Sequence, residues 1–160
     1  MAKRTEAGRD KTRHMDESTR SRIRALDVQA GRNLGRIVDL DRSLAALRTR
    51  AAKVDEALWL HARARNAFQD DRQRNAMSII RFRSIQGVRL AQASAARLAD
   101  ATNGSRNAQA WEALNGAGAS LQSELDRINR EIREREAERG MLHAQNDSLY
   151  RQAASLRWEA

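Results

Sequence analysis

Apolar residues recur along the N-terminal half of the chain at alternating spacings of three and four. Between Ile23 and His61, ten of twelve such positions are apolar, and the exceptions are Asn33 and His61. The run covers more than five heptads, the pattern of a helix that packs lengthwise against another helix. We expect the apolar face of this helix, which we call its seam, to be buried against another copy of the chain or against another protein. The seam consists of Ile23, Leu26, Ile37, Leu40, Leu44, Leu47, Val54 and Leu58.

A second run with the same spacing begins after Ser120. Eight of its eleven seam positions are apolar, and Asn146 is one of the polar exceptions. Oppositely charged residues four apart, such as Arg127 and Glu131, lie on its flanks and support a helix. We expect this seam to pack within the chain or against a partner. It consists of Leu121, Leu125, Ile128, Ile132, Leu142, Leu149 and Leu156.

Few residues interrupt these helical patterns, because the chain has no proline and only eight glycines. The clearest predicted break lies at Gly104, which suits a left-handed helix C-cap, and a second lies at 115–118. The sequence therefore predicts four segments. These are a disordered basic arm at 1–17, a long helical segment with the heptad seam at 18–101, a Gly-rich connector with a short helix at 102–118, and a C-terminal helix at 119–160.

The polar stretch 69–75 allows two architectures. It lacks Gly and Pro, which favours a continuous helix over a turn near Asp70. A helix after Ser120 folded back on a continuous helix covers only about residues 63–101. The first seam would then need another copy or another protein, with Asn33 setting the register. A turn near Asp70 would instead give a self-contained three-helix bundle. The expected fold class is all-α, with long helices in an elongated coiled coil or helical hairpin.

The charge of the chain adds a nucleic-acid hypothesis. Its 30 basic and 21 acidic residues give a net charge of +9, which favours non-specific contact with phosphates. The arginines within 63–89 spread around a helix at about 100° per residue, which disfavours a groove-reading helix. The candidate phosphate contacts lie near the N-terminus and are Lys3, Arg4, Arg9, Lys11 and Arg13.

Residues that carry catalytic chemistry form no recognisable motif. The chain has no Cys, and His14, His61 and His143 are too far apart in sequence for a helical metal pair. We therefore expect no enzyme activity, cofactor, metal or small-molecule substrate.

No stretch approaches the roughly 18 apolar residues of a transmembrane helix. Large side chains on slim helices often anchor interfaces, and the candidate anchors are Trp59, Trp111 and Trp158.

Part of the chain resembles a known family. The run RSIQGVRLAQASA at 83–95 is followed by Asn-Gly-Ser at 103–105, by ELDRI at 124–128 and by Gln-Ala-Ala at 152–154. In these features, residues 77–160 resemble the small internal virion proteins of short-tailed bacteriophages. The resemblance implies packaging inside the capsid, ejection with the DNA, and assembly with partner proteins into a conduit through the host envelope. It also implies synthesis in the host cytoplasm and residence in the virion.

The sequence therefore predicts a non-catalytic coiled-coil structural or assembly protein of a bacteriophage virion. It would act as a homo-oligomer, with other proteins of one assembly, or both. One alternative is a helical stalk or adaptor protein of a bacterial secretion export gate, a bacterial cytoplasmic protein that the chain resembles in architecture. The other is a basic coiled-coil protein that binds nucleic acid without sequence preference.

Overall fold

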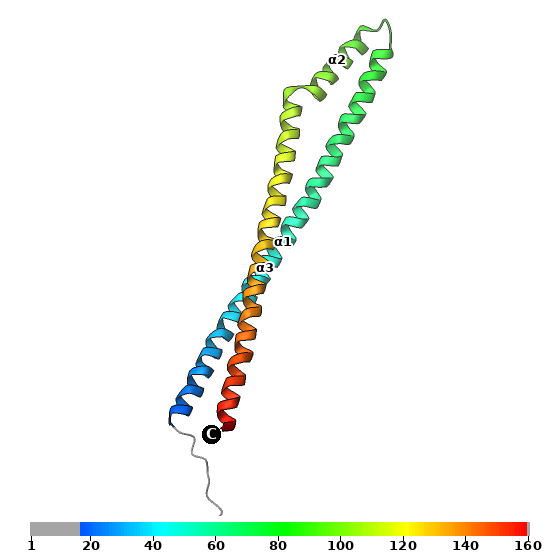
Figure 1. Cartoon of the computed structure of the whole chain (residues 1–160). Helices are drawn as coiled ribbons and strands as arrows, with labels where there is room; N and C mark the ends of the chain where they lie inside the picture. The colour runs from blue at the N-terminus through cyan, green and yellow to red at the C-terminus, as the bar shows by residue number, and fades with distance from the viewer. Residues whose placement is uncertain (1–16, 160) are drawn as a thin grey trace, which may run out of the picture. The chain divides into compact units, whose positions relative to one another are not determined.

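The computed structural model describes residues 17–159, which are helical except at 85–88 and 104. Helix α1 spans Glu17–Ser84, α2 spans Arg89–Asn103 and α3 spans Ser105–Glu159 (Figure 1). The chain reverses at 85–88, so that α1 runs antiparallel to the helices that follow. The described residues contain no strand. The expected all-α fold class, a hairpin of long helices, is therefore confirmed.

The long helices contribute to two compact units. Among the described residues, the first unit contains 17–45 and 133–159, and the second contains 46–132. Within the first unit, the start of α1 and the end of α3 lie side by side, drawn blue and orange to red in Figure 1. The second unit contains the rest of α1, all of α2 and the start of α3, so it includes the chain reversal.

The first unit buries much of the seam that the sequence left without an intrachain partner. Leu44 is only 1% exposed, and Ile37 and Leu40 form a core cluster with Leu142. Ile23, Leu149 and Ala153 are also buried. Full burial of a Leu or Ile side chain is worth about 1.5–3 kcal/mol, so this contact is a major stabilising term. The expectation that this stripe needs a second chain is wrong for these residues, because α3 covers them.

The second unit has a thinner core. Leu47, Ile79 and Ile128 are buried, while the outer seam positions Val54, Leu58, Leu121, Leu125 and Ile132 are half-buried. Helix α2 turns two small residues inward, Ala91 and Ala95, four positions apart on one face. Small side chains there allow the α2 backbone to approach its neighbour closely.

The predicted long helical segment at 18–101 is interrupted, because the chain reverses at 85–88 and α1 ends at Ser84. Gly87 has a φ of +76°, the only positive φ among residues 17–159, and a glycine adopts this value without steric cost. Beside it, the Ser84 hydroxyl donates to the Arg81 carbonyl at 2.7 Å. The early reversal leaves 15 residues in α2 and 55 in α3 to return along the 68 residues of α1. The return path is thus long enough to cover the first seam.

The expected connector at 102–118 is reduced to a break at Gly104. Gly104 is extended, with φ −67° and ψ 163°, rather than left-handed, and its N–H donates to the Asp100 carbonyl at 2.8 Å. Residues 115–118 lie inside α3, because burial against α1 outweighs the cost of about 1 kcal/mol for a glycine in a helix. Helix α1 continues through 69–75. The continuous helix expected there is confirmed, and the bundle with a turn near Asp70 is wrong.

Candidate interaction surfaces

A buried amide pair crosses the seam of the first unit. The Asn33 Nδ2 atom donates to Asn146 Oδ1 at 3.0 Å, and Asn146 Nδ2 donates to the Ala30 carbonyl at 3.4 Å. Asn33 is 8% exposed and Asn146 is 3% exposed. A polar side chain in an apolar seam favours the one register that satisfies it. Asn33 therefore has the polar position expected from the sequence, but its partner belongs to the same chain.

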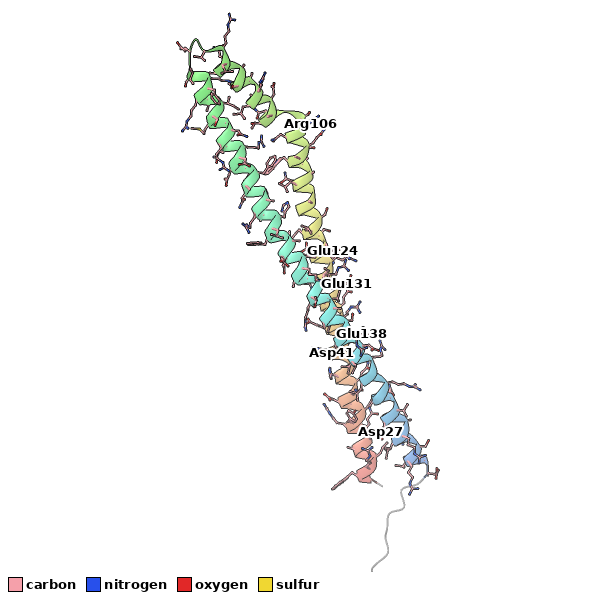
Figure 2. All side chains as sticks on the ribbon, turned by 180° about the vertical axis from the view of Figure 1, so that it is seen from behind. Asp27, Asp41, Arg106, Glu124, Glu131 and Glu138 are labelled. Carbon is pink, nitrogen blue, oxygen red and sulfur yellow. The ribbon has the colours of Figure 1, made fainter. Side chains whose placement is uncertain are left out.

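Ion pairs flank this amide pair on the surface. Asp27 pairs with Arg157 at 3.0 Å, Asp41 pairs with Arg139 at 2.8 Å, and Glu138 pairs with Arg36 (Figure 2). A hydrogen bond from Arg139 to the Asp41 carboxylate raises the pKa of Arg139 above its ordinary value. Exposed ion pairs add little stability. Their contribution here is to favour the alignment that the buried amides already select.

Histidine and tryptophan side chains fill the second unit between α1 and α3. The His61 Nε2 atom lies 2.7 Å from the Leu114 carbonyl oxygen, to which it donates. Further along, the ring of Trp111 stacks on Phe68 with 5.5 Å between centroids, and the Arg65 guanidinium lies 5.5 Å from the Trp111 centroid. His61 thus acts as a polar seam residue. Trp111, one of the expected interface anchors, packs within its own unit.

Glu124 of α3, labelled in Figure 2, forms ion pairs with two arginines in the second unit. The Arg127 guanidinium donates to it twice, at 3.0 and 2.9 Å, and Arg50 of α1 also pairs with it. The hydrogen bonds from Arg127, together with the positive charges of both arginines, lower the pKa of Glu124 below its ordinary value. This cluster links α1 to α3 where the apolar core is thin.

The other expected site residues differ in position. Trp59 is 57% exposed, with the Arg63 guanidinium 4.7 Å from its ring centroid, and Trp158 is 87% exposed. Leu26 and Leu156, at the ends of the two seams, are half-buried and line an open groove of the first unit. The candidate phosphate contacts are all outside the described residues, so that prediction stays untested. They are Lys3, Arg4, Arg9, Lys11 and Arg13.

A group of exposed apolar side chains at the chain reversal was not expected from the sequence. We call it the turn surface, and it consists of Met77, Ile80, Phe82, Ile85, Val88 and Leu90. Leu90 and Ile80 are 77% and 61% exposed. The heptad pattern predicts a continuous helix through these residues, in which an apolar run indicates packing. The dipeptide Gln86-Gly87 inside that run is the signal that could have revealed the turn.

Comparisons with known proteins add no relative. No protein family, curated protein or solved structure matches the chain. Within residues 17–159, no helix has an apolar stretch long enough to cross a membrane. In the same range, His, Asp and Glu side chains do not gather in threes as they would around a metal ion.

Proposed function

We propose that this chain is a non-catalytic structural protein that presents a helical hairpin to other chains. The observation that carries the proposal is the number of large apolar side chains that stay exposed after the seam has closed. Beyond the turn surface they are Val28, Leu34, Val38, Trp59, Leu60, Met141, Tyr150 and Trp158. Single exposed apolar residues are ordinary on a protein surface. A set that includes two exposed tryptophans indicates contact with other molecules.

The proposed self-association uses outer surfaces of the helices. The neighbouring residues Trp59 and Leu60 are both more than half exposed, so they form a candidate contact for a second copy. Tryptophan is enriched among the residues that dominate interface energies, because it buries a large area with few rotatable bonds. Homo-oligomer formation and binding of other assembly proteins both fit this surface.

Sedimentation velocity tests self-association. The wild type at tens of micromolar should sediment as a species larger than the 18.1 kDa chain. The variant Trp59→Ser/Leu60→Ser should shift it towards monomer. A matched variant at exposed positions of the same helix, Ala52→Ser/Glu56→Ser, should leave it unchanged. A wild type that stays monomeric at every concentration would contradict self-association and leave partner proteins as the occupants.

For the assembly itself we propose a bacteriophage virion, in the internal or DNA-ejection apparatus. The support is the resemblance of residues 77–160 to small internal virion proteins, together with a helical hairpin that exposes apolar side chains. Neighbouring genes test this proposal, because portal and tail genes would support it. Genes of a secretion export gate would instead support the stalk or adaptor role. Mass spectrometry of purified virions would then detect the chain or contradict its packaging.

Non-specific nucleic-acid binding is a second candidate, favoured by one local feature of the sequence. Residues 72–99 contain six arginines and no acidic residue. Binding through phosphates alone would weaken steeply with salt and show no sequence preference. We expect weak binding of duplex DNA at low salt that is lost near the physiological value of about 150 mM. Nanomolar affinity at that salt concentration would make nucleic-acid binding the main function.

A further inference from the structure

The turn surface combines exposed apolar side chains with a compact backbone reversal. Residues 85–88 join the last turn of α1 to the first turn of α2 at the end of the second unit (Figure 1). Gly87 makes the reversal tight, and Val88 caps α2 with its carbonyl accepting from Ala91 and Gln92. Residues 80–90 are exposed throughout. The apolar side chains at this end are therefore displayed on a firmly built backbone.

The same segment is strongly positive. Arg81, Arg83 and Arg89 lie among the apolar residues of the turn surface and are exposed. None of the three has an ion-pair partner among residues 17–159. The nearest acidic residues in sequence are Asp71, which pairs with Arg74, and Asp100. The guanidinium groups at the turn are thus free to meet an external anion.

We propose that the turn surface binds the surface of an anionic phospholipid bilayer. Interfacial segments place apolar side chains at the boundary between headgroups and acyl chains, while basic side chains meet the lipid phosphates. Leu90, Ile80 and Ile85 would enter the boundary between headgroups and acyl chains. Arg81, Arg83 and Arg89 would contact the lipid phosphates. The apolar layer of such segments enters by about 5–10 Å. That depth takes in the turn and the adjoining helix ends, where these residues lie.

Charge and apolarity together favour this occupant over nucleic acid. Phosphate backbones would attract the arginines, but aliphatic side chains gain nothing from a phosphate backbone, and single strands are bound by stacking on aromatic rings. The turn surface has one aromatic residue, Phe82, and its other members are four aliphatic residues and one methionine. The contact would be peripheral, in keeping with helices too polar to span a bilayer in the described range. It does not depend on the proposed virion role.

Vesicle flotation with the full chain tests the proposal. Wild type should float with phosphatidylcholine vesicles that contain phosphatidylglycerol and remain unbound with phosphatidylcholine alone. Each arginine near an anionic surface contributes about fivefold in affinity. The variant Arg81→Gln/Arg83→Gln/Arg89→Gln should therefore lose well over tenfold in partitioning. The variant Ile80→Ser/Leu90→Ser should lose a similar amount at unchanged net charge.

Matched variants in the first unit show whether vesicle binding depends on the turn residues or only on the total charge and apolar content of the chain. The controls are Arg20→Gln/Arg24→Gln/Arg32→Gln and Val28→Ser/Val38→Ser, all at exposed positions. Both should keep partitioning within about threefold of wild type, because these residues lie far from the turn in sequence and in another unit. Equal losses in controls and turn variants would overturn the proposal, as would the absence of flotation.

A probe of local environment tests insertion directly. The chain has no Cys, so Val88→Cys and Val38→Cys each give one site for an environment-sensitive dye. Emission from the dye at residue 88 should shift to the blue on anionic vesicles, and emission from residue 38 should not. A different result would assign the surface to nucleic acid instead. The chain would then bind a short DNA duplex more tightly than anionic vesicles, and this binding would be lost in the arginine variant and kept in Ile80→Ser/Leu90→Ser.

Discussion

Asn33 of α1 donates a hydrogen bond to Asn146 of α3 across 113 positions of sequence. Both amides are buried in a seam that is otherwise apolar, and the second Asn146 donor reaches the Ala30 carbonyl. A slip of one helix along the other would separate the two side chains and leave buried polar groups unsatisfied. The pair therefore selects one alignment of α1 and α3 in the first unit.

Removing one member of this pair should cost more than removing both. In Asn33→Ala, the buried Asn146 Oδ1 atom loses the donor that Asn33 supplies, while Asn146 Nδ2 keeps the Ala30 carbonyl. The unsatisfied oxygen should destabilise the first unit by about 1–3 kcal/mol. The double variant Asn33→Leu/Asn146→Leu should recover that loss or exceed wild-type stability, with a less well-defined register. Urea unfolding measures the stability, and disulfide trapping between paired Cys substitutions at seam positions measures the register.

An exposed asparagine provides the control for that experiment. Asn66→Ala in the same helix should shift the urea midpoint only slightly. If Asn33→Ala behaved like Asn66→Ala, the amide pair would not hold the alignment.

The sequence located both asparagines in their seams but did not pair them. Ile23, Leu40 and Leu44 followed a clear period, so their burial was predictable. The partner of a seam depends on where the chain turns back. Gly104, beside Asn103 and Ser105, resembles a stronger helix stop than Gly87 within its apolar run. A reversal at Gly104 would leave α3 too short to reach Asn33.

Packing overrode local propensity elsewhere as well. Gly116 and Gly118 predicted a break, and the contacts of α3 with α1 kept them helical. The sequence does not show which of the candidate interface anchors are exposed. Trp59 is exposed and Trp111 stacks on Phe68, but no sequence feature near either residue distinguishes the two cases. The turn surface could be recognised only once the reversal was placed.

The left-handed conformation at Gly87 leads to a second prediction. A methyl group there would meet no atom within 4 Å, so the cost of Gly87→Ala comes from the backbone alone. That cost should be about 1–2 kcal/mol for a positive φ. Asn tolerates this region better, so Gly87→Asn should lose less. Thermal melting followed by circular dichroism would rank wild type, Asn and Ala in that order, and a neutral Gly87→Ala would contradict the assigned turn.

Glu124 gives a prediction about acid. Its pKa is lowered in the folded chain, chiefly by the hydrogen bonds from Arg127. A depressed carboxyl pKa contributes stability that is fully present above the unfolded value of about 4.3 and is lost as pH falls through the folded value. Glu124→Gln should therefore be less stable than wild type at neutral pH, and the two should converge in acid.

Melting temperatures across that pH range would measure the convergence. Glu112→Gln serves as the control, because Glu112 is exposed on the same helix and has no ion-pair partner among the described residues. It should melt in parallel with wild type. A constant gap between wild type and Glu124→Gln from neutral pH into acid would show that the loss is not ionic.

Two glycines two positions apart in α3 should respond to alanine in opposite directions. At Gly116 a methyl group would meet nothing within 4 Å, so Gly116→Ala should stabilise the helix by about 0.5–1 kcal/mol. At Gly118 the same atom would lie 2.5 Å from His61 Cε1. The His61 ring is held by its bond to the Leu114 carbonyl and cannot retreat without losing that bond. Gly118→Ala should therefore destabilise the second unit.

A double variant identifies the histidine as the cause. In His61→Ala the space beside residue 118 is open, so adding Gly118→Ala to that background should stabilise the chain as Gly116→Ala does in the wild type. Chemical denaturation of the four members of this cycle yields the coupling free energy between the two residues. A coupling near zero, with Gly118→Ala as stabilising as Gly116→Ala, would mean that His61 does not pack against α3 at this point, and the alignment of the helices in the second unit would have to be revised.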